Sequence, residues 1–383
     1  NMPFYQKQGQ LPNKRHIQFR NKDNNLYWEE LVSREGFSYI YSNLYHVNPP
    51  TQIQMVGDLE PIEINEWKDK HKHRHIFTRN LDLKGDMISS REALFFNDDV
   101  IISKGFAKTQ MDYLYKNARY DECIFVHEGK GSIISSFGKM PLKKHDYIII
   151  PKGVIWKVDV DQDVEFLAIE SKSPIETPSK YRNRLGQLLE HSPYSERDII
   201  TPKLENVNAR GSVNIKIRID NGLQTYKYKK HPFDLVGWDG FYFPWIFNLN
   251  DFMPITGMIH QPPPVHQVFQ AHGLVICNFV PRLFDYHPLA VPAPYAHSNV
   301  DSDEILYYAE GNFMSRKGIE TGSITFHPSG PPHGPQPGKI EQSLGAKKTD
   351  EIAVMIDTFK PLKPTQNIKP VDDKNYPYSW IKE

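Results

Sequence analysis

Apolar residues along this chain gather in short runs that alternate with polar residues or continue for a few positions. Gly, Pro, Asn or Asp interrupts most of these runs. Short strands separated by turn residues are typical of β-sandwiches and β-barrels. The pattern therefore predicts an all-β-dominated protein, with strands at Glu122–His127, Asp146–Pro151, Val213–Ile219, Glu304–Tyr308 and Ile352–Ile356.

Helical periodicity is scarce in this sequence. Tyr181–Glu190, a polar segment of modest length, is the one clear helix candidate. Ser90–Asn97 and the carboxyl end of the chain fit either a helix or a strand. We therefore expect helices to contribute little to the fold.

An internal repeat says more about the architecture than any single strand. ECIFVHEG at 122–129 returns as EILYYAEG at 304–311, an offset of 182 residues. Downstream, Pro-x-Gly at 151–153 returns at 328–330, an offset of 177 residues. Because the two offsets are nearly equal, the sequence predicts two copies of one β-unit.

The second copy carries two motifs that resemble those of the cupin barrel. Gly322, Pro328, Gly330 and His333 match the pattern G-x5-P-x-G-x2-H, and Glu304 and Gly311 match the end of the preceding motif. His297 supplies a histidine seven residues before Glu304, and Tyr295 stands where another histidine is usual. The resemblance implies a jelly-roll-like β-barrel that holds a metal ion.

The first copy keeps Glu122 but lacks the other ligand-type residues. It has no upstream histidine, Trp156 stands at the place of the final histidine, and His145 stands at the place of the glycine. We expect this copy to be a degenerate barrel without metal, with Glu122 bonded to other polar groups. We predict an N-terminal β domain at 1–235, with the degenerate cupin at about 115–170, and a C-terminal catalytic domain at 236–383.

His297, Glu304 and His333 form a candidate metal site. Two neutral imidazoles and one carboxylate on one face of an ion leave open positions for other ligands, an arrangement that suits Fe(II) in oxygen-using enzymes. The alternative is that the barrel persists without its metal.

Other histidines and one glycine-rich stretch invite functional interpretations. His71, His73 and His75 alternate, but basic residues surround them and no carboxylate accompanies them, so we predict a solvated strand or loop. His266 is interpreted as structural. The GKGS stretch at 129–132 lacks the ending of a phosphate-binding loop.

The segment Gly237–Gly338 resembles homogentisate 1,2-dioxygenase. The resemblance rests on the stretches GWDGFYFPWIFNLNDFM, HQPPPVHQVFQAHG, NFVPRLF, PYAHSNVDSDEILYYAEGNF and GSITFHPSGPPHGP. It implies that His297, Glu304 and His333 bind Fe(II), that His260 and His327 are catalytic and contact the substrate, and that His333 also borders the substrate. It further implies extradiol-type cleavage of homogentisate by O2 to 4-maleylacetoacetate, in tyrosine and phenylalanine catabolism, by a homo-oligomer (trimer or hexamer).

Two departures from the family bear on the substrate. Phe313 stands where the family has a tyrosine near the substrate, and Glu310 stands where it has an arginine. Phe313 is therefore a candidate substrate contact, and a related hydroquinone or a gentisate-like compound is an alternative substrate. Alternatives of other classes are a zinc or manganese cupin isomerase and a non-catalytic two-cupin binding protein.

Charge and cysteine content limit the classes of binding partner and the cellular compartment that we expect for this protein. The formal net charge is +0 at pH 7, which gives no long-range attraction to nucleic acid or to an anionic membrane. Cys123 and Cys277 lie far apart among apolar residues, as expected of reduced, buried thiols. No apolar run reaches transmembrane length. We expect a cytoplasmic protein whose partners are a small aromatic substrate and O2.

Overall fold

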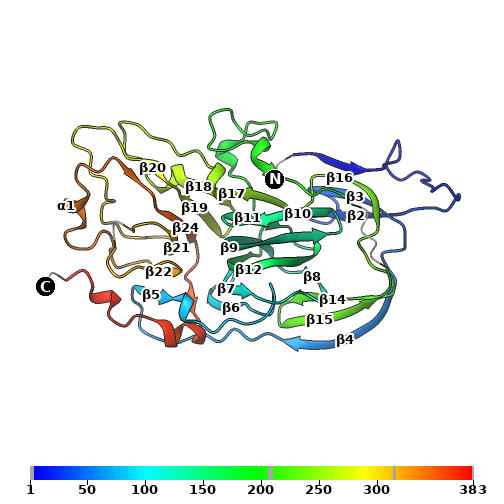
Figure 1. Cartoon of the computed structure of the whole chain (residues 1–383), viewed down its shortest axis with the longest axis horizontal. Helices are drawn as coiled ribbons and strands as arrows, with labels where there is room; N and C mark the ends of the chain where they lie inside the picture. The colour runs from blue at the N-terminus through cyan, green and yellow to red at the C-terminus, as the bar shows by residue number, and fades with distance from the viewer. Residues whose placement is uncertain (1–3, 206–209, 314–315, 382–383) are drawn as a thin grey trace.

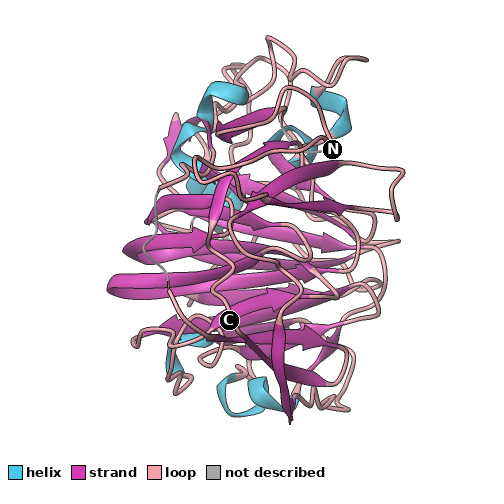
Figure 2. Cartoon of the chain, turned by 90° about the vertical axis from the view of Figure 1, so that its right-hand side faces the viewer, coloured by secondary structure: helices cyan, strands magenta, loops and turns pink. Residues whose placement is uncertain are grey.

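The computed structural model describes residues 4–205, 210–313 and 316–381. Strands dominate this part of the chain (Figure 2). Its helices are the five-residue α1 (Lys339–Ser343) and the short 3-10 helices η1 (Thr78–Asn80), η2 (Ser179–Tyr181), η3 (Glu196–Asp198), η4 (Leu249–Asp251), η5 (Pro263–His266), η6 (Gln366–Val371) and η7 (Tyr376–Tyr378). None of the described helices is long and apolar enough to span a membrane. The predicted all-β-dominated class is confirmed.

The largest sheet contains the first cupin copy and occupies the middle of the molecule (Figure 1). Its thirteen strands are β4 (Ile53–Pro61), β6 (Glu92–Phe96), β7 (Val100–Ala107), β8 (Leu114–Asn117), β9 (Asp121–Ser135), β10 (Gly138–Lys143), β11 (Asp146–Ile150), β12 (Ile155–Ser171), β13 (Ile199–Ile200), β14 (Val213–Ile219), β15 (Gly222–Tyr228), β17 (Trp245–Asn248) and β25 (Lys363–Pro364). The five strands expected from the sequence pattern all form, three of them in this sheet.

A six-stranded sheet contains the second cupin copy, in the order β18-β19-β24-β21-β22-β5. Its members are β5 (Arg74–Phe77), β18 (Gln267–Gln270), β19 (Leu274–Phe279), β21 (Asp303–Glu310), β22 (Ser323–His327) and β24 (Ile352–Thr358). Buried aromatic side chains join the two copies, since the Tyr147 and Phe269 rings lie 5.2 Å apart and the Phe95 and Phe326 rings 5.0 Å apart. One continuous apolar core therefore supports both copies.

Backbone conformation confirms the internal repeat. Gly129 and its counterpart Gly311 have φ of 113° and 102°. His145 has φ of 68°, and its counterpart Gly322 has φ of 84°. A left-handed conformation is uncommon for a residue other than glycine. The first copy thus keeps the backbone of the motif after losing the glycine itself.

A buried polar cluster also joins the two copies. Lys104 Nζ donates to Glu165 Oε1 at 3.0 Å and to the Tyr307 hydroxyl at 3.2 Å. The Tyr307 hydroxyl also bonds to His127 Nδ1, and His127 Nε2 bonds to the Ala309 carbonyl at 2.9 Å. Burial lowers the pKa of Lys104 to about 8, against the raising effect of Glu165. These bonds fix β21, which carries Glu304, against the first copy.

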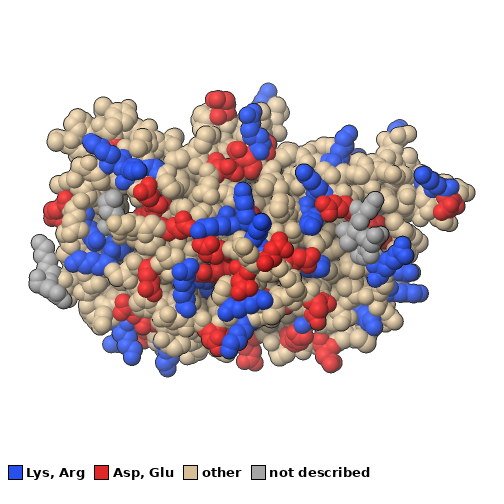
Figure 3. Space-filling model, in the orientation of Figure 1, with Lys and Arg blue, Asp and Glu red and all other residues tan. Residues whose placement is uncertain are grey.

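Smaller sheets complete the fold. β1 (Gln6–Gly9), β16 (Leu235–Gly240), β3 (Tyr41–His46) and β2 (Trp28–Ser33) form one, and β20 (Arg282–Leu283) pairs with β23 (Lys348–Thr349) in another. Acidic and basic side chains intermingle on the face shown in Figure 3. Cys123 and Cys277 are both buried and free, as expected.

The predicted helix at Tyr181–Glu190 is wrong. Arg182 and Leu188 pair as an antiparallel bridge, so the chain reverses direction between them. The Asn183 side chain accepts hydrogen bonds from the backbone N–H groups of Leu185 and Gln187, at 3.0 and 3.2 Å. This local bonding to an asparagine side chain competes with helical bonding and stabilises a turn. The ambiguous segment Ser90–Asn97 contains strand β6.

The prediction of a solvated strand or loop for the alternating histidines is wrong for two of the three. His71 is exposed, but His73 and His75 are 7% and 1% exposed. β5 pairs antiparallel with β22, with His75 opposite Thr325, and thus becomes the edge of the six-stranded sheet. His73 Nε2 lies 3.1 Å from the carbonyl of Pro332, and the His75 ring lies 5.6 Å from that of Tyr376. Both contacts come from residues far along the chain, which no local pattern could indicate.

Strands cross the predicted division between 1–235 and 236–383 in both directions. β5, from the N-terminal part, pairs with β22. β17 and β25, from the C-terminal part, pair with β11 and β6 in the large sheet. The division stays a prediction about the sequence, and the sheets themselves interleave the two parts.

Candidate metal centre

Two chain segments and one strand bring His297, Glu304 and His333 together. Glu304 is near the start of β21, where it pairs with His327 of β22. His333 lies beyond β22, and its backbone N–H donates to the carbonyl of His297 at 2.9 Å. The reciprocal bond from His297 to His333 measures 2.8 Å. This two-bond bridge fixes both histidines beside the carboxylate.

The three side chains offer one donor atom each within 4.8 Å of one another. Glu304 Oε1 lies 3.4 Å from His333 Nε2, and Glu304 Oε2 lies 3.9 Å from His297 Nε2. Glu304 and His333 are buried, whereas the His297 side chain is 39% exposed. Protein atoms therefore enclose the candidate metal site around Glu304 and His333, whereas solvent reaches it beside His297.

The donor set fits a divalent ion. Both ring nitrogens of His333 are buried without a hydrogen-bond partner, which is costly unless another group satisfies them. Burial opposes ionisation of Glu304, but the nearby side chains of His297, His327 and His333 favour the carboxylate more strongly and hold the pKa of Glu304 well below its usual range. A carboxylate and neutral imidazoles are ligands that a transition metal accepts.

His327 lies behind Glu304. Its Nδ1 is 2.7 Å from Glu304 Oε1, and its Nε2 is 2.8 Å from the Tyr376 hydroxyl. Burial lowers the pKa of His327 to about 3, so the ring is neutral near pH 7. A carboxylate only accepts, so Nδ1–H donates to Glu304 and Nε2 accepts from Tyr376. His327 orients the carboxylate, while its predicted contact with substrate stays a prediction.

A cavity of about 180 Å³ opens in front of the three residues. Its walls are mostly apolar and include Phe279, Leu306 and Met355. Polar and charged side chains also line it; these are His260, Gln261, His266, Arg282, Asp285, Tyr295, His297, Glu304, Tyr308, Arg316, His333 and Glu351. Its location beside a candidate metal site makes it the candidate substrate pocket.

The two histidines of the HQPPPVH stretch have different surroundings. His260 is 44% exposed at the cavity, with Nδ1 3.5 Å from Asp285 Oδ2 and its ring 5.2 Å from that of Tyr295. His266 is buried against Phe279, and burial lowers its pKa to about 3. His260 can therefore reach a ligand in the cavity, and His266 forms part of its wall.

The two positions that depart from the family do not line the cavity. The Phe313 ring packs edge-on against Tyr308 at 4.7 Å, in a small apolar cluster with Ala353. Glu310 bonds to Lys144 and lies 3.4 Å from His145 Nε2, at the contact with the first copy. Neither residue is among those that line the cavity. The predicted contact between Phe313 and substrate is not supported by this placement.

We therefore expect Phe313→Tyr to leave the apparent Michaelis constant for homogentisate little changed. The new hydroxyl would lie in the cluster behind Tyr308 and would not reach a cavity ligand. Steady-state oxygen uptake measures this constant. A clear drop in the constant would show that position 313 does meet the substrate.

The corresponding site of the first copy contains different side chains on the same backbone. Tyr115 and Trp156 pair antiparallel, as His297 and His333 do in the second copy, and their rings lie 5.4 Å apart. The fully buried Glu122 accepts a hydrogen bond from Arg91 Nη1. In the first copy a guanidinium, not a pair of imidazoles, meets the carboxylate. That this copy binds no metal stays a prediction.

Sequence reasoning missed several residues around the cavity. Arg282, Arg316 and Glu351 line it, and Tyr376, from the C-terminal 3-10 helix η7, bonds to His327. Arg316 lies three residues beyond Phe313. Phe313 is a position at which the family has a residue near the substrate, and this nearness in sequence was the only signal for Arg316. Such a signal does not by itself distinguish a pocket residue from a surface one.

Comparison with known proteins shows which family this chain resembles. The family model described as "Homogentisate 1,2-dioxygenase N-terminal" matches residues 96–249. A Saccharolobus solfataricus protein named "Putative dioxygenase" is 44% identical over 385 residues, covering 99% of both chains. Homogentisate 1,2-dioxygenase of Mus musculus is 26% identical, covering 78% of this chain and 72% of that protein.

Other matches share less of their sequence with this chain. Homogentisate 1,2-dioxygenase of Pseudomonas putida is 23% identical, covering 68% of this chain and 62% of that protein. A solved cupin 2 conserved barrel domain protein from Leptotrichia buccalis aligns with 79% of this chain and all of its own, at 10% identity and a TM-score of 0.35. The near full-length relative and the family model together show that this chain belongs to the homogentisate 1,2-dioxygenase family.

Proposed function

We propose that this protein is an Fe(II)-dependent dioxygenase that opens the ring of homogentisate or of a closely related hydroquinone. The observation that carries the proposal is the set of His297, Glu304 and His333 facing a cavity of ligand size. The names of the relatives support the same reaction class.

His297, Glu304 and His333 would hold the ion. When bound, Fe(II) supplies a coordination face with open positions at which an aromatic diol and O2 can react. The hydrogen bond that His327 Nδ1–H donates to Glu304 Oε1 would favour the ionised carboxylate and hold it in position, as such partners commonly do for metal ligands.

The remaining side chains bind and orient the substrate. The apolar walls at Phe279, Leu306 and Met355 can pack against an aromatic ring and exclude water. His260, whose Nδ1 lies 3.5 Å from Asp285 Oδ2, would accept the proton of a substrate hydroxyl. Product formation as 4-maleylacetoacetate, within tyrosine and phenylalanine catabolism, follows if homogentisate is the substrate.

Oxygen consumption with Fe(II) and a panel of hydroquinones tests the proposal, combined with metal analysis after anaerobic purification. Iron together with oxygen uptake on homogentisate, gentisate or hydroquinone supports the dioxygenase. Zinc or manganese without oxygen uptake would instead support a cupin isomerase. A protein that takes up no metal under any loading condition would support a binding protein without catalysis.

We expect His260→Ala to lower turnover by about 10²–10⁴-fold, the usual range for a lost general base. Bound iron should be retained, because His260 lies outside the three ligands. The acidic limb of the pH–rate profile should shift or vanish. His272→Ala, at an exposed histidine outside the cavity, is the matched control. Near-normal turnover with an unchanged acidic limb would remove His260 from the mechanism.

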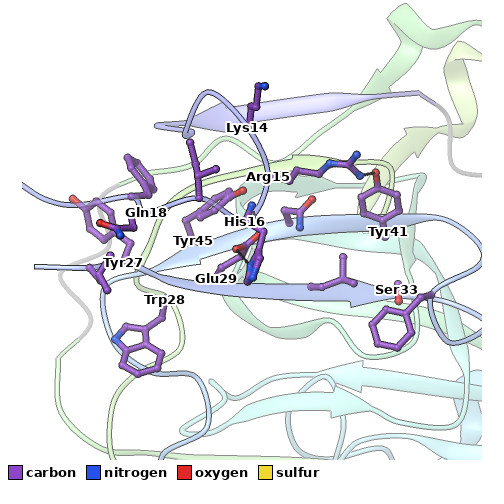
Figure 4. A pocket seen from close by; sticks show the side chains of 16 residues that line it. Lys14, Arg15, His16, Gln18, Tyr27, Trp28, Glu29, Ser33, Tyr41 and Tyr45 are labelled. Carbon is purple, nitrogen blue, oxygen red and sulfur yellow. Dashed lines mark hydrogen bonds and ion pairs between the residues drawn. The ribbon is translucent and has the colours of Figure 1, made fainter.

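We also propose that the protein is a homo-oligomer, either a trimer or a hexamer. The N-terminal sheet offers a broad groove of about 1170 Å³ between the segment at Arg15 and strands β2 and β3 (Figure 4). Trp28 and Phe37 line it and are 49% and 86% exposed. Sedimentation equilibrium measures the oligomeric state, and a monomer at micromolar concentration contradicts this proposal.

A further inference from the structure

The alternating histidines of the stretch KDKHKHRH have no role in the proposed function so far. They lie just before and within β5, which runs beside β22 (Figure 1). The chain continues from β22 through a turn to the candidate ligand His333. Each of the three imidazoles lies within hydrogen-bond distance of this segment, at the Ser329 carbonyl for His71, the Pro332 carbonyl for His73 and Ser323 Oγ for His75. A segment from the N-terminal part of the chain thus holds the candidate ligand segment at three points.

His73 packs directly against the candidate metal site. Its side chain is buried, and its ring lies edge-on to the rings of His327 and His333, at centroid distances of 5.3 and 5.8 Å. A carbonyl oxygen only accepts hydrogen bonds, so Nε2–H of His73 donates to Pro332 at 3.1 Å. Nδ1 of His73 is buried without a hydrogen-bond partner among the described residues. Within that part of the chain, the hydrogen bonding of this side chain is therefore directed at Pro332.

The peptide between Pro332 and His333 is held from both sides. Its carbonyl accepts from His73, and its N–H, which belongs to His333, donates to the carbonyl of His297 at 2.9 Å. Because a peptide unit is planar, two bonds on opposite sides fix the orientation of the whole plane. The ring of Pro332 also restricts φ at that residue. The orientation of this plane determines where the His333 side chain starts, and hence where its ring lies relative to Glu304.

We propose that His73 positions the candidate metal ligand His333 by holding the Pro332–His333 peptide in place. The inference rests on the proposed function, because it concerns a ligand of that metal site. A metal-binding histidine is usually oriented by a hydrogen bond from its second ring nitrogen to a neighbouring group. Among the described residues, neither ring nitrogen of His333 has such a partner. The backbone of His333 therefore has to supply the orientation, and His73 fixes that backbone.

Titration of the metal-free protein with Co(II) tests this role without turnover. Co(II) accepts imidazole and carboxylate ligands, as Fe(II) does, and its visible absorption bands depend on the coordination geometry. We expect His73→Leu, which is apolar and donates no hydrogen bond, to weaken Co(II) binding about 10- to 100-fold, as for other residues that orient metal ligands. The absorption bands at saturation should also shift. Wild-type affinity and an unchanged spectrum in this variant would overturn the proposal.

Two amide variants keep the test decisive even if the leucine variant does not fold. The side-chain amide nitrogen of glutamine reaches about as far as Nε2 of histidine, whereas that of asparagine reaches about as far as Nδ1. His73→Gln should retain most of the Co(II) affinity, because it can still donate to Pro332. His73→Asn should lose as much affinity as His73→Leu. An affinity of the glutamine variant that is equal to or below that of the asparagine variant would contradict the role of His73.

His75→Leu is the matched control. His75 is also a buried histidine of the same segment, but its Nε2 lies 2.8 Å from Ser323 Oγ, before the turn that leads to His333. Its loss should lower the melting temperature of the metal-free protein and leave Co(II) affinity unchanged. If His75→Leu weakened Co(II) binding as much as His73→Leu, both histidines would merely support the fold, and the positioning role would be refuted.

Oxygen uptake by the iron-loaded protein separates this inference from the proposed function. A wild type that consumes oxygen with a hydroquinone, together with unchanged metal binding in His73→Leu, refutes the role of His73 and leaves the dioxygenase standing. The opposite result is a wild type that consumes no oxygen, with Co(II) binding that His73→Leu weakens as expected. That result refutes the dioxygenase and supports the role of His73. A wild type that binds no Co(II) or Fe(II) refutes both.

Discussion

Glu304→Ala is expected to abolish metal binding and, with it, oxygen uptake, while the fold persists. Glu304 supplies the only carboxylate among the three candidate ligands, and three histidine side chains surround it. Without it, the buried site would retain two imidazoles and no negative charge to offset that of a divalent ion. His297→Ala and His333→Ala should likewise lose the metal, because each removes one of three ligands.

Metal content per chain, measured beside oxygen uptake, checks this expectation. His327→Ala is the matched control, since it removes a partner of Glu304 but no candidate ligand. Loss of such an outer partner costs about 10–100-fold in metal affinity, so this variant should still load at high metal concentration. Stoichiometric iron in any two of the three ligand variants would end the ligand assignment.

Arg91→Ala is expected to destabilise the protein by about 3–5 kcal/mol, the usual cost of removing one partner of a buried ion pair. Arg91 donates to Glu122, which is fully buried, and Glu170 lies close enough to add repulsion. Burial already raises the pKa of Glu122, even with Arg91 present. Without the guanidinium, an uncompensated carboxylate would remain in the first copy.

The pH dependence of this variant has a definite sign. A carboxyl group whose pKa is raised by folding binds more protons in the folded state, so stability falls as pH rises through the raised pKa. The defect of Arg91→Ala should therefore shrink on acidification, and adding Glu122→Gln should recover part of the loss. Urea unfolding at mildly acidic and neutral pH measures both effects.

A surface ion pair provides the control for the buried one. Arg119 Nε lies 3.2 Å from Asp220 Oδ1, and both side chains are largely exposed. Arg119→Ala should cost less than about 1 kcal/mol. A similarly small loss for Arg91→Ala would show that Glu122 is stabilised by other groups or is protonated in the folded protein.

The sequence by itself determined the repeat, the predicted strands and the candidate ligands. These features depend on local patterns, because a strand shows its alternation within a few residues and the turn after β22 requires Pro and Gly at fixed positions. His297, Glu304 and His333 all fall on one motif, so their spacing along the chain was enough to group them, and the structure places them together.

Only the tertiary structure decided what surrounds that group. β5 brings His75 to the edge of the second copy, Tyr376 reaches His327 from the C-terminal segment, and Arg316 comes to lie against Gly334. The contacts of β5 and Tyr376 link residues far apart in the chain, and no sequence periodicity records such pairing. The turn at Asn183 failed as a helix for a related reason, since a single side chain bonded to the backbone outweighed a weak helical pattern.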